Sequence, residues 1–273
     1  MVASPLNTEL RVITSPLTPE HRDHFISEGF TPEEIDRLID MGVKSISGSE
    51  ALNRNFKIWN GTRWLTDDGT LMPFNKDYGQ LRLNTPIKVP GRKKPVKYLT
   101  PFQSRCQLFS PRGASVTTEG FKDAVLPTLR GVPTRAIPGV SQVIHLFPKG
   151  CGETLLFDSD AWTNPGVMGQ LIKGAIWTGG KVQVFPEMPK YPHGGACEFF
   201  KCGYTIEDYR ALIADALDPV SLIEKWASTW HKLPDDVQSE CLSTATQMVE
   251  RLKDPESYIL KIEADKASKQ SNH

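Results

Sequence analysis

The spacing of hydrophobic and polar positions changes three times along the chain. From Thr18 to Gly42 the pattern is that of two short helices, each with a capping Thr, an early Pro and a terminal Gly. Between 56 and 112, aromatic and β-branched residues mix with Gly and Pro, which is typical of short strands joined by turns. After 114, strand-like apolar runs alternate with helical stretches, and from 204 onward the pattern is helical alone. We therefore predict an α/β protein with a central parallel sheet, preceded by a helical and β-rich segment and followed by helices.

Turn and cap residues divide this pattern further. Asn60-Gly61 predicts a two-residue turn between strands 56–59 and 62–65, because both residue types tolerate a positive φ. The predicted strands of the parallel sheet are 114–118, 134–137, 154–157 and 181–185, with helices over 121–129 and 165–177. The predicted organisation is a flexible lead-in over 1–17, a helical cap plus a β-rich basic segment over 18–111, the core over 112–203, C-terminal helices over 204–266 and a disordered tail over 267–273.

The charges are sorted along the chain, although they sum to zero. The 273 residues hold 32 Lys and Arg and 32 Asp and Glu. Residues 78–118 contain eight basic residues and no acid, whereas residues 204–265 contain 13 acids and six bases. Because a basic segment interleaved with aromatic side chains can follow phosphates and stack on bases, this pattern favours nucleic acid as a partner. Ordinary solvated hairpin strands are the alternative explanation of the same segment.

Several classes of protein find no support in the sequence. No apolar run reaches the roughly 18 residues that a membrane span needs, and the N-terminus has no secretory signal pattern. The five cysteines have neither disulfide nor zinc spacing. The chain has no G-x-x-x-x-G-K-[ST] loop, so ATP-driven helicase activity is not expected of it. We expect a cytoplasmic protein without a membrane partner.

Two acidic motifs follow predicted core strands. The first contains Glu119, and the second contains Asp158 and Asp160. Because functional residues gather at the carboxyl ends of parallel strands, we expect these three acids to converge. Carboxylate oxygens suit Mg²⁺ or Mn²⁺, so Asp158 and Asp160 are candidate metal ligands, and Glu119 is a third ligand or a general acid/base. The alternative is that the Asp-x-Asp step simply caps the next helix.

The order of these features resembles the Toprim domain of bacterial primases, topoisomerases and some nucleases. That order is strand, Glu-Gly, helix, strand, Gly, strand, Asp-x-Asp, helix, and it covers residues 112–187. The Glu-Gly-Phe-Lys-Asp-Ala run at 119–124 looks most like the primase branch. The resemblance implies a Toprim-like parallel sheet and Mg²⁺-dependent phosphoryl chemistry. Asp158 and Asp160 would hold the metal, and Glu119 would assist the attacking or leaving oxygen.

A second resemblance, to a domain of unknown function in cyanobacterial, plasmid and phage replication proteins, covers more of the chain. The segments that carry it are the helix pair 21–42, Leu71–Phe74, Gln80–Arg82, Pro95–Pro101 and Thr118–Gly120. That family usually has a Gly-x-Asp-Asp-Tyr-Leu stretch after its core. Gly195–Phe200 keeps one of its carboxylates and Ile206–Tyr209 keeps both, so we assign the stretch to Ile206–Tyr209.

Together these features predict a Toprim primase-like nucleotidyltransferase in plasmid or phage DNA replication. Its partners would be DNA, single-stranded or as a primer-template, and nucleotides, with a replicative helicase as a candidate protein partner. The expected nucleic-acid contacts are Arg82, Lys93, Lys94, Lys97 and Lys122. A Toprim nuclease that uses the same acids is one alternative, because polymerisation and hydrolysis need the same ions at the same phosphate. A non-catalytic DNA-binding or replisome adaptor is the other.

Overall fold

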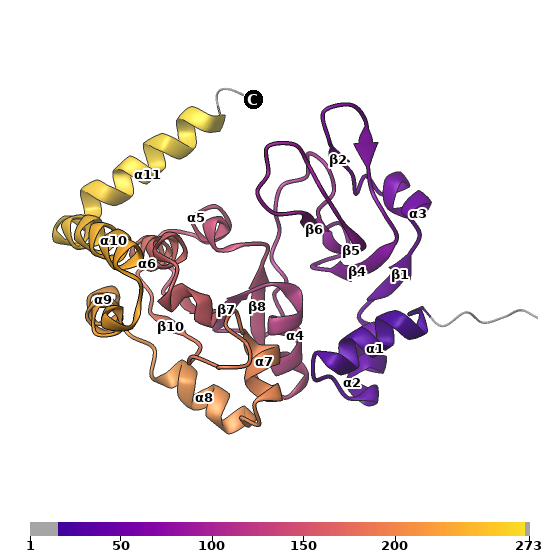
Figure 1. The fold of residues 1–273 in the computed structure, drawn as a ribbon, viewed down its shortest axis with the longest axis horizontal. Coiled ribbons are helices and arrows are strands. Elements are labelled where there is room, and N and C mark those ends of the chain that lie inside the picture. The colour runs from indigo at the N-terminus through magenta and orange to yellow at the C-terminus, as the bar shows by residue number, and fades with distance from the viewer. Residues whose placement is uncertain (1–15, 271–273) are drawn as a thin grey trace, which may run out of the picture.

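The computed structural model describes residues 16–270, which form two main sheets surrounded by helices (Figure 1). The antiparallel sheet has the strand order β1 (Lys44–Ile46), β4 (Gly69–Pro73), β5 (Gly79–Ile87) and β6 (Val96–Leu99). The parallel sheet has the strand order β10 (Val182–Val184), β9 (Thr154–Phe157), β7 (Val116–Glu119) and β8 (Thr134–Ile137). The predicted α/β class with a central parallel sheet is therefore confirmed.

Two helices precede the antiparallel sheet, as the capping residues predict. In α1 (Pro19–Ser27) the Thr18 hydroxyl accepts the N–H of His21, and in α2 (Pro32–Asp40) Thr31 and Glu34 form a capping box. These helices share a core with the parallel sheet. The short helix α3 (Gly48–Asn53) packs on the opposite face of the antiparallel sheet, in a second core. The antiparallel sheet is therefore covered on both faces.

The predicted hairpin forms, but in a different register. It consists of β2 (Ile58–Trp59) and β3 (Trp64–Leu65), and Trp59 lies opposite Trp64. A two-residue turn at Asn60-Gly61 would instead place Trp59 opposite Thr62, so that prediction was wrong. The Asn60 carboxamide oxygen accepts the backbone N–H groups of Thr62 and Arg63 at 3.0 and 2.8 Å, and this shifts the turn towards the C-terminus.

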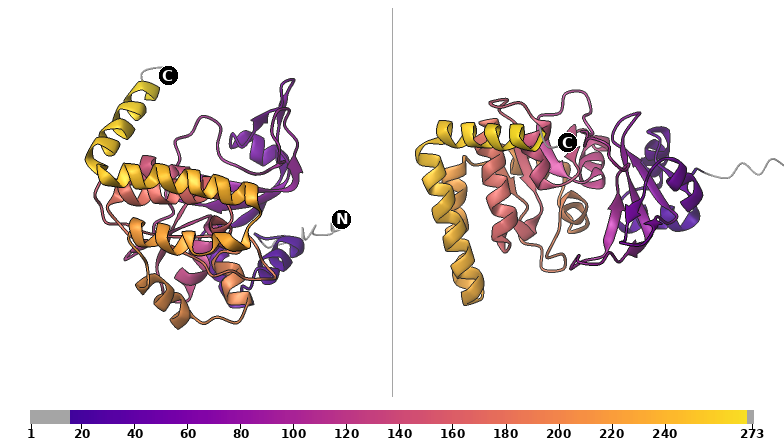
Figure 2. Two further views of the ribbon diagram at one scale, coloured as in Figure 1. Left: turned by 60° about the vertical axis from the view of Figure 1, so that its left-hand side comes forward. Right: turned by 90° about the horizontal axis from the view of Figure 1, so that it is seen from above.

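Helices cover both faces of the parallel sheet and make three layers (Figures 1 and 2). The first face carries α4 (Phe121–Leu129), α7 (Ala196–Lys201) and α8 (Ile206–Ala214). The second face carries α5 (Val143–Leu146), α6 (Pro165–Thr178), α9 (Pro219–Ala227) and α10 (Asp235–Lys253). Successive residues of a strand point to opposite faces, so Leu155 and Phe157 pack on the second face while Leu156 packs on the first.

The two ends of the described chain are more ordered than the sequence predicts. Residues 1–15 and 271–273 lie outside the described residues, but Leu17 is fully buried although it falls in the predicted lead-in. Helix α11 (Pro255–Gln270) continues into the segment 267–270, which we expected to be disordered, so that prediction was wrong. Neither α11 nor any other helix within residues 16–270 is long and apolar enough to cross a membrane.

Candidate active site

The acidic motifs meet at one edge of the parallel sheet because their strands are neighbours. Strand β7 pairs with β9 in parallel, with Val116 opposite Thr154. Glu119 ends β7, and Asp158 comes directly after β9 and begins the 3₁₀ turn η2 (Ser159–Trp162). Gly120, at φ +82°, lets the chain turn from β7 into α4. The expected order of strands, acids and helices is therefore confirmed.

Asp158 is the most confined of these acids. Its Oδ1 atom is buried and has no hydrogen-bond partner among residues 16–270. Burial raises the pKa of Asp158 well above its ordinary 3.8, and the neighbouring carboxylates of Asp123 and Glu119 raise it further. A buried polar atom without a partner is unfavourable, which makes this oxygen a candidate contact for a group from outside residues 16–270.

Glu119 and Asp160 complete the predicted set. Burial raises the pKa of Glu119 to about 7, with further contributions from the charges of Asp160 and Asp123. The pKa of Asp160 is also raised by burial, against the opposing charges of His193 and Lys94. The His193 ring nitrogen Nδ1 lies 3.6 Å from an Asp160 carboxylate oxygen. The three acids are therefore close enough to change one another's ionisation.

Asp123 belongs to the same site, although it was not among the acids predicted from the sequence. It lies in the first turn of α4, and its Oδ1 atom accepts the backbone N–H of Cys197 at 2.8 Å. A Cβ atom placed on Gly195 would lie 2.7 Å from Asp158 Oδ1 and 2.8 Å from Asp123 Oδ1. The two carboxylate oxygens are therefore no more than 5.5 Å apart, the sum of these distances.

The carboxylate of Gly195–Phe200 borders this site, whereas from Ile206–Tyr209 only the buried Tyr209 lies near enough to Asp123 to be affected by its charge. The negative charge of Glu198 raises the pKa of both Asp158 and Asp123, and its side chain accepts the Gly195 N–H at 3.1 Å. Asp208 instead caps α8 and is exposed. The assignment of the family's acidic stretch to Ile206–Tyr209 stays a prediction, but of the two candidate stretches only Gly195–Phe200 brings a carboxylate beside Asp123 and Asp158.

The acids suit a divalent cation by their chemistry, although they are not arranged as a ready metal site. Within the described part of the chain, no group of three or more His, Cys, Asp and Glu side chains is positioned to hold a metal ion. The donors are nevertheless all carboxylate oxygens, which Mg²⁺ and Mn²⁺ prefer. Asp158 Oδ1 has no partner within residues 16–270, and the mutual repulsion of the acids is what a cation would relieve. The donor chemistry of Asp158, Asp160 and Glu119 therefore suits such an ion, and the metal site itself stays a prediction.

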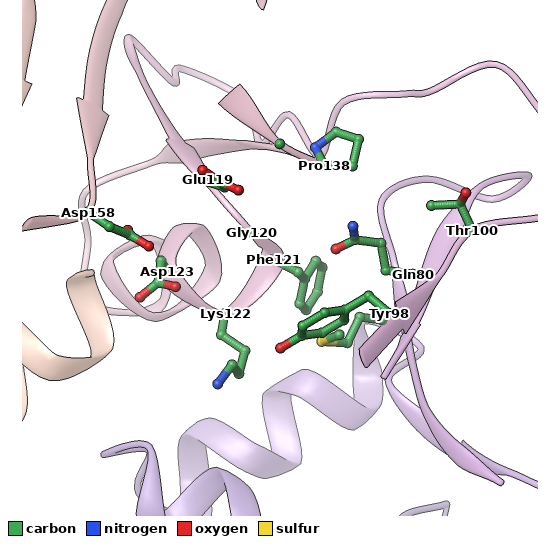
Figure 3. A pocket seen from close by; sticks show the side chains of 12 residues that line it. Gln80, Tyr98, Thr100, Glu119, Gly120, Phe121, Lys122, Asp123, Pro138 and Asp158 are labelled. Atoms are coloured by element: carbon green, nitrogen blue, oxygen red, sulfur yellow. The ribbon is translucent and has the colours of Figure 1, made fainter. Parts of the chain in front are cut away.

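A pocket of about 450 Å³ lies in front of the acids, between the two sheets (Figure 3). Glu119, Asp123 and Asp158 line one wall, which belongs to the parallel sheet and α4. The opposite wall comes from the antiparallel sheet and presents Gln80 and Tyr98. The pocket therefore combines acidic groups with neutral polar and aromatic groups from a different part of the chain.

The five predicted nucleic-acid contacts are placed differently with respect to this pocket. Lys94 lies in the exposed loop between β5 and β6 and is near enough to Asp160 to lower its pKa. Lys93 and Lys97 are exposed on the same loop and on β6, and Arg82 lies near His24 of α1. Lys122 lines the pocket, but its ammonium group forms a 2.8 Å ion pair with Glu28. All five contacts stay predictions.

Comparison with known proteins adds no relative to this picture. No protein-family model matches the chain, and no curated protein matches it. The two family resemblances therefore rest on the short motifs and their order, and on nothing more.

Proposed function

We propose that the protein catalyses divalent-metal-dependent phosphoryl transfer on nucleic acid, as a Toprim primase-like nucleotidyltransferase in plasmid or phage DNA replication in the cytoplasm. The observation that carries the proposal is the buried Asp158 Oδ1, which has no partner within residues 16–270 and lies among the charges of Glu119 and Asp123. Burying like charges together opposes folding. Such an arrangement is typical of a functional site.

Asp158 and Asp160, with Glu119, would hold Mg²⁺ or Mn²⁺. When bound, the ion would neutralise charge on phosphoryl oxygens during transfer. Glu119 would serve either as the third ligand or as a general acid/base, and in the latter role its pKa of about 7 in the metal-free protein would let it exchange a proton near neutral pH. It is therefore suited to accept a proton from the attacking hydroxyl or to donate one to the leaving oxygen.

The surroundings of the acids support a nucleic-acid substrate. Lys94 brings a positive charge to the same side of the site as Asp160, from a loop that carries further cations. The pocket has room for a small polar substrate such as a nucleotide, and Tyr98 and Gln80 can contact it from the wall opposite the acids. A single nucleic-acid substrate would place its phosphates near the positive charge of Lys94 and its reacting oxygens near Asp158.

A strand-synthesis assay tests the proposal. The full chain is incubated with single-stranded DNA, labelled nucleotides and Mg²⁺ or Mn²⁺, alongside an Asp158→Ala/Asp160→Ala variant. We expect short new oligonucleotides from the wild type and none from the variant. The matched control is Asp235→Ala/Asp236→Ala, which removes two exposed acids from the start of α10 and leaves the products unchanged.

Other products would point to the alternatives. Shortened input strands that depend on Asp158 and Asp160 identify a nuclease that uses the same acids. DNA binding that survives the double substitution, with neither product, identifies a non-catalytic adaptor and contradicts the proposal.

A further inference from the structure

Two tryptophan side chains of the β2–β3 hairpin are exposed to solvent. Trp59 is 47% exposed and Trp64 is 39% exposed, which is unusual for such large apolar side chains. The hairpin projects from the end of the antiparallel sheet that lies away from α1 and α2 (Figures 1 and 2). Neither tryptophan lines the pocket beside the acids. Their exposure is therefore a separate feature of the molecule.

The rings are held in fixed positions. The register of the hairpin sets Trp59 opposite Trp64, with their ring centroids 5.4 Å apart at 62°. Trp64 also packs on Phe102 at 4.5 Å, and the Lys57 ammonium lies 4.8 Å from the Trp64 ring centroid. A two-stranded hairpin is only marginally stable alone, so the contact with Phe102 explains the presence of Trp64. It does not explain Trp59, whose one aromatic ring contact among the described residues is Trp64.

The charge around the tryptophans favours an anionic partner. Residues 51–66, which include the hairpin, contain Arg54, Lys57 and Arg63 and no acid, and the nearest acids in the sequence are Glu50, Asp67 and Asp68. Arg54 is paired with Glu50 at 2.9 Å, whereas within residues 16–270 neither Lys57 nor Arg63 is in an ion pair. Exposed aromatic rings combined with cations are the features that bind single strands, because bases stack on the rings while phosphates meet the cations.

The hairpin is also connected to the pocket. Phe102, which contacts Trp64, comes two residues after Thr100, which lines the pocket. Two residues span at most about 7 Å, so the residue that holds Trp64 is a near neighbour of the pocket wall.

From these observations we infer that Trp59 and Trp64, together with Lys57 and Arg63, form a stacking platform for single-stranded nucleic acid. This inference does not rest on the proposed catalysis. A strand would bind here whether or not the acids transfer phosphoryl groups.

The test measures binding of a fluorescent 20-nucleotide poly-dT strand to the full chain in EDTA, by fluorescence anisotropy. EDTA removes divalent ions, so binding is measured apart from any metal-dependent chemistry. We expect Trp59→Ala to weaken binding about fivefold or more, which is the typical effect of losing one stacked base. Trp59→Phe keeps an aromatic face and should bind nearly as the wild type does. The control Tyr204→Ala removes another exposed ring, which stacks on Phe199, and should not change affinity.

An abasic strand of the same length tests stacking without relying on a substitution. The wild type should bind it more weakly than poly-dT, whereas Trp59→Ala should bind the two strands about equally. Equal binding of both strands by the wild type would overturn the inference. So would an unchanged affinity of Trp59→Ala, or no binding of poly-dT at all, which would leave a protein partner as the explanation of the exposed rings.

Discussion

The Asp123 carboxylate accepts the backbone N–H of Cys197 at 2.8 Å and joins the first turn of α4 to the first turn of α7. Asp123→Ala removes the acceptor and leaves this buried N–H without a partner, so we expect the free energy of unfolding to fall by about 1–3 kcal/mol. Asp123→Asn keeps an acceptor oxygen and removes a charge beside Asp158. It should be at least as stable as the wild type at pH 8. Urea unfolding measures both variants, and equal destabilisation by Ala and Asn would contradict this role of the hydrogen bond.

The raised pKa of Glu119 predicts how stability changes with pH. In the folded state Glu119 keeps its proton up to about pH 7, whereas its ordinary pKa is 4.5. Between these values the folded state binds more protons than the unfolded state, so the contribution of Glu119 to stability falls as the pH rises from 4.5 to 7. Glu119→Gln does not titrate. The free energy of unfolding of the metal-free variant should therefore exceed that of the wild type increasingly over this range.

Urea unfolding in EDTA between pH 4.5 and pH 8 measures this difference. Titrating groups far from Glu119 cancel in the comparison, whereas Asp158, whose pKa the charge of Glu119 raises, changes the difference in the same direction. A difference that does not change with pH would show that Glu119 has an ordinary pKa in the folded protein.

Gly195 offers a way to disturb the acidic site without changing any acid. Its backbone is extended, with φ at −103°, so an alanine would be tolerated there by conformation. The Cβ atom of that alanine would nevertheless lie 2.7 Å from Asp158 Oδ1 and 2.8 Å from Asp123 Oδ1. Both distances are shorter than the contacts that Cβ atoms make in proteins. We expect Gly195→Ala to reduce the metal-dependent rise in melting temperature by at least half. The control is Gly203→Ala, whose Cβ atom meets no neighbour within 4 Å although its φ is positive. An undiminished metal response in Gly195→Ala would show that the cation is held elsewhere.

Lys122 has a structural role that can be separated from nucleic-acid binding. Its ion pair with Glu28 at 2.8 Å ties α4 to α1, and both side chains are only 15% exposed. Lys122→Met leaves Glu28 with the more distant Lys201, at 3.8 Å, so we expect a loss of about 1–3 kcal/mol in stability. Lys97→Met, at an exposed site, should leave stability unchanged and weaken DNA binding. A Lys122→Met protein of wild-type stability would favour the predicted nucleic-acid contact instead.

The predictions that succeeded depend on residues close together in the sequence. The capping box of Thr31 and Glu34 needs only four residues, and the bounds of α4, β8 and β9 follow from caps, glycines and apolar runs. The register of the β2–β3 hairpin was missed because the Asn60 side chain, rather than the pattern of strand residues, positions the turn. The last turn of α11, over 267–270, was missed because its Ala-Ser-Lys-Gln sequence has no large apolar residue that would continue a helical period.

The part of the candidate site that depends on residues close to strand ends was predicted, and the part that depends on contacts between distant residues was not. Glu119 ends β7, and Asp158 and Asp160 come within three residues of the end of β9, so their meeting at one edge could be expected from the order of elements. Asp123 and Glu198 are acidic neighbours of Asp158 only because α7 packs on α4, and the bond from Asp123 to Cys197 joins residues 74 apart in sequence. No local pattern reports such a contact.

The segregation of charge along the chain becomes a dipole in the folded molecule. The acid-free segment 78–118 lies with β5 and β6 on one side of Figure 1, and the acidic helices α8 to α11 lie mostly on the other. At its isoelectric point near pH 7.0 the molecule therefore has two oppositely charged ends rather than a neutral surface. Such a molecule can adsorb to cation and anion exchangers alike, and at low ionic strength its copies attract one another end to end. Added salt screens this attraction, so the protein should become more soluble as the salt concentration rises from very low values.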